Sequence, residues 1–304
     1  MRRTLSQTRV FLCTMLVEML RCSYELIASF YLGKSFARTT WTFLATDTPN
    51  DVRASEHVAC VGLRGKDRIQ LTCAPPLIET QLVEEVSHLI QEVINVEKGI
   101  EIKLRGTIWS PADFEQLGCA ELKLTGNPFY TNGNELVETQ RMTIDLLMKM
   151  FDIGWKLIAS VTLSQRINDK CCFIFESSTP VKTSIFGLSP ASTDLLRIIS
   201  APREVRLTLK RLIEEYWTKG VQESEETEWG VHFKLHGNPW PLRDNCDDAI
   251  RGRILVTAII EEMSRNGWHV LCAADVGSRT TEDDEGRIVT DDPDLILFIN
   301  TPVR

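Results

Sequence analysis

The stretch Tyr24-Glu-Leu-Ile-Ala-Ser-Phe-Tyr-Leu32 reappears 131 residues later as Trp155-Lys-Leu-Ile-Ala-Ser-Val-Thr-Leu163. The same shift aligns residues 8–49 with residues 139–180 without a gap, and ten of the 42 aligned pairs are identical. This similarity predicts an internal repeat, in which successive copies of one structural unit follow each other along the chain.

Two further matches extend the repeat. Residues 99–109 align with residues 230–240 at the same shift, and both segments contain Lys-Leu-x-Gly. The motif at 234–240 also resembles the one at 123–129, where Gly-Asn-Pro again precedes an aromatic residue. Gly267-Trp268 then matches Gly154-Trp155. The sequence therefore predicts three copies, of which the first lacks its leading strand and the third lacks its second half.

Each copy contains an amphipathic helix whose apolar residues recur with helical spacing. The apolar stripes are Phe11, Leu12, Met15, Leu16 and Met19 in the first copy, Met142, Leu146, Leu147, Met150 and Phe151 in the second, and Leu255, Ile259, Ile260 and Met263 in the third. We expect each stripe to be the core-facing side of its copy. Gly154 and Gly267 follow these helices, where glycine commonly ends a helix in a left-handed conformation.

Strands surround this helix in each copy. The predicted order is β-α-β-β-(β)-α, followed by the Lys-Leu-x-Gly strand of the next copy, and a second helix is expected over residues 77–93 and 204–217. The fold class is therefore α+β, built from tandem repeats with helices packed on one face of a mainly antiparallel sheet. A ferredoxin-like arrangement is one way to close such a unit.

The repeat divides the chain into residues 1–109, 119–229 and 230–304. Only the middle segment contains every element. A fragmentary copy, a truncated gene model, or strands shared between neighbouring copies each explain the two incomplete segments, and the sequence leaves these alternatives open.

Composition predicts a soluble globular chain and weighs against general nucleic-acid binding. Of the 304 residues, 43% are apolar and 25% are charged, which is enough apolar material for a sizeable core. The formal net charge is −8, whereas proteins that bind phosphate backbones non-specifically are usually basic.

Cysteine usage favours a reducing, cytoplasmic location. The nine cysteines are odd in number, most lie within apolar runs, and no Cys-x-x-Cys motif occurs. Buried thiols in a reducing compartment explain this pattern best. No stretch of eighteen uncharged apolar residues occurs, so no membrane span is expected.

The Gly-Asn-Pro turns are the first candidate binding feature. Asn127 and Asn238 each leave a strand and approach a helix N-terminus, where backbone N–H groups can hold a small anion. A purely structural turn explains the same residues. Trp109 and Trp240 follow the Lys-Leu-x-Gly strands and are candidates for contacting a ligand or partner, although each also fits a role in capping the core.

No motif indicates catalysis, a metal or a cofactor. His232 and His236 lie on a predicted strand without a third metal ligand at suitable spacing. Phosphate-binding glycine motifs and the common hydrolase motifs do not occur in the sequence. We therefore expect no metal and no cofactor.

One helix has a basic side. Arg203, Arg206, Lys210 and Arg211 are spaced so that three of them follow one face of the helix expected after residue 203. A solvated surface explains this face, and contact with RNA or an acidic partner is the alternative.

The sequence favours a protein that works by binding. The repeated residues are core and turn types rather than titratable groups, which predicts a non-enzymatic protein-interaction or scaffold module. An open sheet edge in an incomplete copy could accept a strand from a protein partner. The first alternative is an enzyme or a binder of small anions, with a site at the junction of two copies. For that site the residues of interest are Arg166, Arg279, His236 and Asp275. The second alternative is RNA binding through the basic helix.

Overall fold

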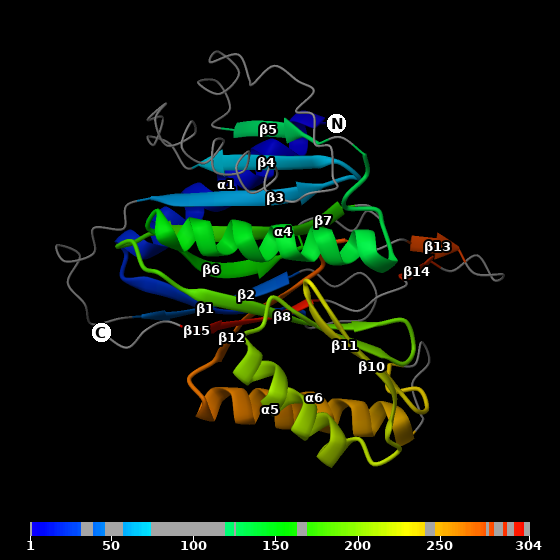
Figure 1. Ribbon diagram of the computed structural model, residues 1–304. Coiled ribbons are helices and arrows are strands. Elements are labelled where there is room, and N and C mark those ends of the chain that lie inside the picture. Colours follow the sequence, from blue (N-terminus) through cyan, green and yellow to red (C-terminus); the bar gives the residue numbers. More distant parts are fainter. Residues whose placement is uncertain are drawn as a thin grey trace. The chain divides into compact units, whose positions relative to one another are not determined.

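The computed structural model describes residues 2–31, 39–45, 57–73, 119–124, 126–162, 169–240, 247–277, 280–282, 288–290 and 295–300. These residues form four helices and fifteen strands (Figure 1). The chain divides into two compact units. The first comprises Met1–Tyr130 and Lys149–Val181, and the second comprises Thr131–Met148 and Lys182–Arg304. The helix expected over residues 77–93 lies outside the described residues.

The first unit contains a five-stranded antiparallel sheet in the order β5-β4-β3-β7-β6. Its strands are β3 (Val58–Arg64), β4 (Arg68–Cys73), β5 (Cys119–Lys123), β6 (Trp155–Val161) and β7 (Asp169–Ser177). Helix α1 (Arg2–Arg21) packs against β3 and β4. It is followed by an antiparallel hairpin of β1 (Tyr24–Tyr31) and β2 (Thr39–Ala45).

The second unit contains a six-stranded antiparallel sheet in the order β10-β11-β9-β8-β15-β12. Its strands are β8 (Ser184–Ala191), β9 (Leu195–Ile199), β10 (Val221–Thr227), β11 (Gly230–Leu235), β12 (His269–Ala274) and β15 (Leu295–Asn300). The helices are α4 (Gly133–Asp152), which ends in the first unit, α5 (Arg203–Tyr216) and α6 (Asp247–Arg265). A small hairpin joins β13 (Thr280–Glu282) and β14 (Ile288–Thr290).

The two large sheets are built in the same way, and this confirms the α+β, tandem-repeat fold. The order β5-β4-β3-β7-β6 in the first matches β11-β9-β8-β15-β12 in the second. Both sheets have a β-bulge at the same place, between Leu157 and Ala159 in β6 and between Val270 and Cys272 in β12. Strands from two successive sequence copies thus pair within each sheet. The element order in the second unit is αββαββαββ when β13 and β14 are set aside, which is longer than the βαββαβ order of a ferredoxin-like unit.

The core of the second unit lies between its sheet and the helices α5 and α6. Phe186 of β8 stacks on Phe298 with ring centroids 4.8 Å apart and meets Trp268 edge-on at 5.0 Å. Leu209 of α5 and Leu255 of α6 are fully buried in the same cluster. Burial of these apolar side chains is the main stabilising contribution to this unit.

Helix α4 packs on the opposite face of this sheet. A Cβ atom placed on Gly187 would lie 3.3 Å from Ile144 Cδ1, and Gln140 Nε2 donates a hydrogen bond of 3.0 Å to Ser189 Oγ. Residues 187 and 189 point away from Phe186 because side chains alternate along a strand. The sheet of the second unit therefore carries helices on both of its faces, whereas the sequence predicts helices on one face only. Helices α5 and α6 do share one face, as the sequence predicts.

The turn after the repeated helix has the same conformation in all three copies. Gly154 and Gly267 have φ values of +86° and +79°, as expected for a glycine that ends a helix. Ser23 occupies the equivalent position after α1 with φ of +62°. The first copy thus keeps the geometry of the turn without the glycine. The segment boundaries derived from the sequence, 1–109, 119–229 and 230–304, stay predictions about the repeat.

Candidate functional site

Helix α1 exposes the side that its two counterparts bury. Phe11 is 65% exposed, whereas the equivalent Met142 of α4 and Leu255 of α6 are 2% and 0% exposed. The apolar stripe of the first copy was expected to be core, and for Phe11 this expectation is wrong. An apolar side chain in water forgoes the stabilisation that burial gives its counterparts.

Three neighbours of Phe11 follow the same trend. Met15 and Met19 lie one and two turns further along α1 and are half-buried. Tyr24, just after α1, is 41% exposed, whereas the equivalent Trp155 and Trp268 are 4% and 7% exposed. We call Phe11, Met15, Met19 and Tyr24 the open face.

The side of α1 that carries Arg9 and Cys13 packs against the first sheet. Arg9 is buried, hydrogen-bonds to Gln70 of β4, and fills the space where a Cβ atom of Gly62 would lie. Cys13 donates a weak hydrogen bond to the Thr72 carbonyl at 3.9 Å. These contacts repeat those of Gln140 and Ile144 in α4, so α1 is held in place while its open face stays accessible.

Strand β2 is the second part of the candidate site. In the complete sheets, β7 pairs with both β6 and β3, and β15 pairs with both β12 and β8. Within the part of the chain that the structure describes, β2 pairs only with β1. An unpaired strand edge offers backbone N–H and C=O groups to an incoming strand.

The Gly-Asn-Pro turn of the third copy holds an anion that belongs to the chain itself. The Asn238 backbone N–H donates to Asp248 Oδ2 at 2.9 Å, and Lys219 Nζ lies 2.6 Å from Asp248 Oδ1. Asp248 lies in the first turn of α6 and is buried. A Cβ atom on Gly237 would come within 2.5 Å of this carboxylate, which explains the glycine. The carboxylate occupies the position where the sequence suggested an external anion.

This arrangement makes stability depend on pH. The hydrogen bond from Lys219, and then that from the Asn238 N–H, lower the pKa of Asp248 below its usual value. A lowered pKa in the folded state stabilises the fold above the carboxyl's unfolded pKa of about 4, and the contribution disappears as pH falls through the folded pKa.

Asp248→Asn is therefore expected to cost about 1–2 kcal/mol at pH 7 and much less at pH 3. Urea unfolding at both pH values measures the difference. Asp247→Asn is the matched control, because Asp247 is exposed in the same helical turn. An equal cost of the Asp248 substitution at both pH values would contradict the assigned role of this carboxylate.

The other residues predicted from the third copy have structural contacts. Trp240 is half-buried, and its indole N–H donates to the Leu195 carbonyl at 2.9 Å, which fits the core-capping alternative. His236 is exposed, and its carbonyl accepts a hydrogen bond from the Trp217 indole at 3.0 Å. Asn127, in the second copy, is exposed in a turn closed by the Tyr130 N–H. Their roles in binding a ligand or partner stay predictions.

Of the four basic residues predicted on α5, Arg206 and Arg211 form ion pairs with carboxylates. Arg206 lies 3.5 Å from Glu226, and Arg211 lies 3.3 Å from Glu215 and 3.1 Å from Glu262. Arg203 and Lys210 are exposed. These ion pairs reduce the positive potential that an RNA-binding face requires.

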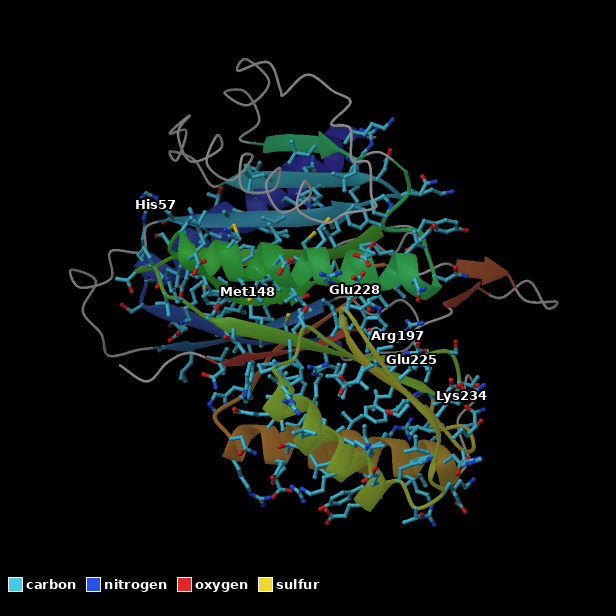
Figure 2. The ribbon with its side chains drawn as sticks, viewed as in Figure 1. His57, Met148, Arg197, Glu225, Glu228 and Lys234 are labelled. Atoms are coloured by element: carbon cyan, nitrogen blue, oxygen red, sulfur yellow. The ribbon has the colours of Figure 1, made fainter. Side chains whose placement is uncertain are left out.

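A polar row crosses the sheet of the second unit on the face where α4 packs. Glu225 of β10 lies opposite His232 of β11, which in turn lies opposite Arg197 of β9. Figure 2 shows Arg197 and Glu225 on these strands. His232 Nε2 is 3.5 Å from Glu225 Oε2, and the Trp229 ring stacks on His232. Within this row Glu225 and His232 form a pair of opposite types across two strands, as cross-strand neighbours commonly do.

Several predicted residues lie outside the described part of the chain. Trp109, Arg166 and Arg279 are among them, and Asp275 is half-buried at the end of β12. In the ranges that are described, no cluster of three His, Cys, Asp or Glu side chains is placed to hold a metal ion. None of the described helices has the length and apolar character needed to span a membrane.

One family of protein domains, of uncharacterised function, matches the chain over residues 57–120, 112–176 and 184–298. These stretches cover well over half of the sequence. The chain belongs to this family. The first two stretches overlap and together run from β3 to β7, and the third runs from β8 to β15, so the family's domain follows the two large sheets. Helix α1, β1 and β2 precede the matched residues.

No curated protein and no solved structure matches the chain.

Proposed function

We propose that this family member is a non-enzymatic protein-interaction or scaffold module that binds another protein through the open face and the adjoining edge of β2. The observation that supports this proposal is the 65% exposure of Phe11 at a position where α4 and α6 bury an apolar side chain. Aromatic residues and methionine are enriched at protein interfaces, and methionine adapts its shape to a partner surface.

The test replaces Phe11 by glutamate in the tagged full-length chain. A carboxylate there would be desolvated without a counter-charge when a partner docks, which is unfavourable. We expect the amount of partner that co-purifies from the chain's own cells to fall at least about tenfold, which corresponds to about 1.4 kcal/mol of binding free energy.

Leu207→Glu is the matched control for this substitution. Leu207 is 58% exposed on α5, a helix of the second unit that is not part of the open face. The control should therefore retain the partner at the wild-type level. Equal retention by the Phe11→Glu chain, or equal loss by both variants, would contradict the proposal.

The proposal includes a reducing, cytoplasmic location. Cys13, Cys60, Cys171 and Cys172 are buried thiols. A hydrogen bond with Cys172, together with burial, raises the pKa of Cys60 well above its usual value, so this thiol stays protonated and unreactive. Buried thiols of this kind are typical of proteins from reducing compartments.

A further inference from the structure

The second unit contains a covered version of the open face. Leu255, Ile259 and Met263 of α6 are the counterparts of Phe11, Met15 and Met19, and they are buried in the cluster that β8, β9 and α5 complete. In that unit the covering elements are thus a β-hairpin followed by a helix. The internal repeat therefore provides a template for what covers the open face of α1.

The strand pairing of the template applies directly to β2. In the second unit, Phe298 of β15 lies opposite Val270 on one side and Phe186 of β8 on the other. In the first copy, Phe43 of β2 lies opposite Leu26 in the equivalent hairpin. The counterpart of β8 would pair antiparallel with the other edge of β2.

The aromatic contacts of the template also have counterparts. Phe186 lies against both Trp268 and Phe298, at centroid distances of 5.0 and 4.8 Å. Tyr24 and Phe43 occupy the corresponding positions in the first copy, and both are more exposed than their counterparts. They are placed to receive an apolar side chain from the incoming strand.

The carboxylate of Glu18 in α1 lies at the position that Glu262 occupies in α6. In α6, Glu262 pairs with Arg265 one turn later and also accepts Arg211 of α5 at 3.1 Å. In α1 the same positions are Glu18 and Arg21, which pair at 2.6 Å. Glu18 is 60% exposed and so remains accessible to a cation on a helix lying beside α1.

We propose that the open face binds the β-hairpin–helix half of a domain of this same family, carried by a protein other than a second copy of this chain, in which β8, β9 and α5 already cover α6. Its first strand pairs antiparallel with β2, an apolar residue of that strand lies between Tyr24 and Phe43, and a cation of its helix pairs with Glu18. This assignment rests on the proposed function, because it names the partner of the same surface.

The experiment fuses a second copy of residues 182–240 to the N-terminus of the full-length chain through a flexible Gly/Ser linker. This segment contains β8, β9, α5, β10 and β11 and is the half-domain that the template provides. The linker makes docking intramolecular and so raises the effective concentration of the segment. We expect amide hydrogen exchange in β2 to slow at least about tenfold relative to the unfused chain.

Two substitutions in the added segment make the test specific. Phe186→Asp in that segment should abolish the slowing, because the strand then presents a charge to the aromatic pair. Arg211→Glu in the added segment should weaken the slowing, and Glu18→Arg in α1 should restore it. Such a charge swap isolates the proposed ion pair.

Unchanged exchange in β2, or equal slowing with the Phe186→Asp segment, would overturn this assignment. So would light scattering that shows a dimer of the unfused chain which Phe11→Glu makes monomeric, because a second copy would then be the occupant. If partner capture depends on Phe11 while β2 exchange is unchanged, the assignment is overturned and the proposed function stands. If hydrogen exchange in β2 slows while capture of a partner does not depend on Phe11, the proposed function is overturned.

Discussion

Leu255→Ala is expected to lower the free energy of unfolding of the second unit by about 2–5 kcal/mol, the usual cost of truncating a fully buried leucine. Leu255 is completely buried in α6, in the same cluster as Ile259 and Phe298. The cavity left by the substitution would have no polar lining to hold water. Urea unfolding measures the loss, and hydrogen exchange of α6 amides assigns the transition to this unit.

Phe11→Ala is the matched substitution in the first copy. It removes a larger side chain at the equivalent helix position, yet we expect a change of less than about 0.5 kcal/mol, because the side chain is largely in water. The expected loss of stability is larger for the buried leucine than for the exposed phenylalanine, although phenylalanine is the larger side chain. The difference therefore reflects burial of the helix face. A loss of about 2 kcal/mol or more for Phe11→Ala would show that its side chain is packed within the chain.

Gly230→Ala is the second substitution with a large expected effect. Gly230 begins β11 with φ of +153°, and a Cβ atom there would overlap the carbonyl oxygen of Ile198 in β9. The neighbouring strand would have to move in the middle of the sheet, since the clash is with backbone. We expect a loss of about 3 kcal/mol or more, at the upper end of what overpacking costs.

Gly65→Ala separates the effect of the clash from that of the backbone conformation. Gly65 has φ of +60° in the turn between β3 and β4, and a Cβ atom there would meet no atom within 4 Å. Its loss should be about 1–2 kcal/mol, which is the cost of a left-handed conformation for a residue other than glycine. Equal losses for the two alanine variants, measured by urea unfolding, would contradict the packing argument for Gly230.

The sequence predicts the tandem repeat and the helices α4 and α6, but not strand β10. Helical spacing of apolar residues located α4 and α6, and the glycines at 154 and 267 located their ends, because these features depend on local backbone and side-chain geometry. For the Gly-Asn-Pro turn, the sequence favours a structural turn and leaves anion binding as an alternative.

Long-range pairing could not be predicted in the same way. Nothing local shows that β3 pairs with β7 or β8 with β15, so the sharing of strands between successive copies was one alternative among three. The exposure of Phe11 depends on that pairing, because its counterpart Leu255 is covered by strands distant in sequence. Likewise, the anion held at Asn238 is Asp248, ten residues further along the chain, and periodicity does not reveal a side-chain contact of this kind.

Capture of a partner by the full-length chain shows whether the open face binds another protein. The quantity to measure is the amount of co-purifying protein retained by Phe11→Glu relative to wild type, at equal loading and with Leu207→Glu alongside. We expect a ratio of about one-tenth or less for Phe11→Glu and a ratio near one for Leu207→Glu. A ratio near one for Phe11→Glu would contradict the proposed function, because the open face would then play no part in binding.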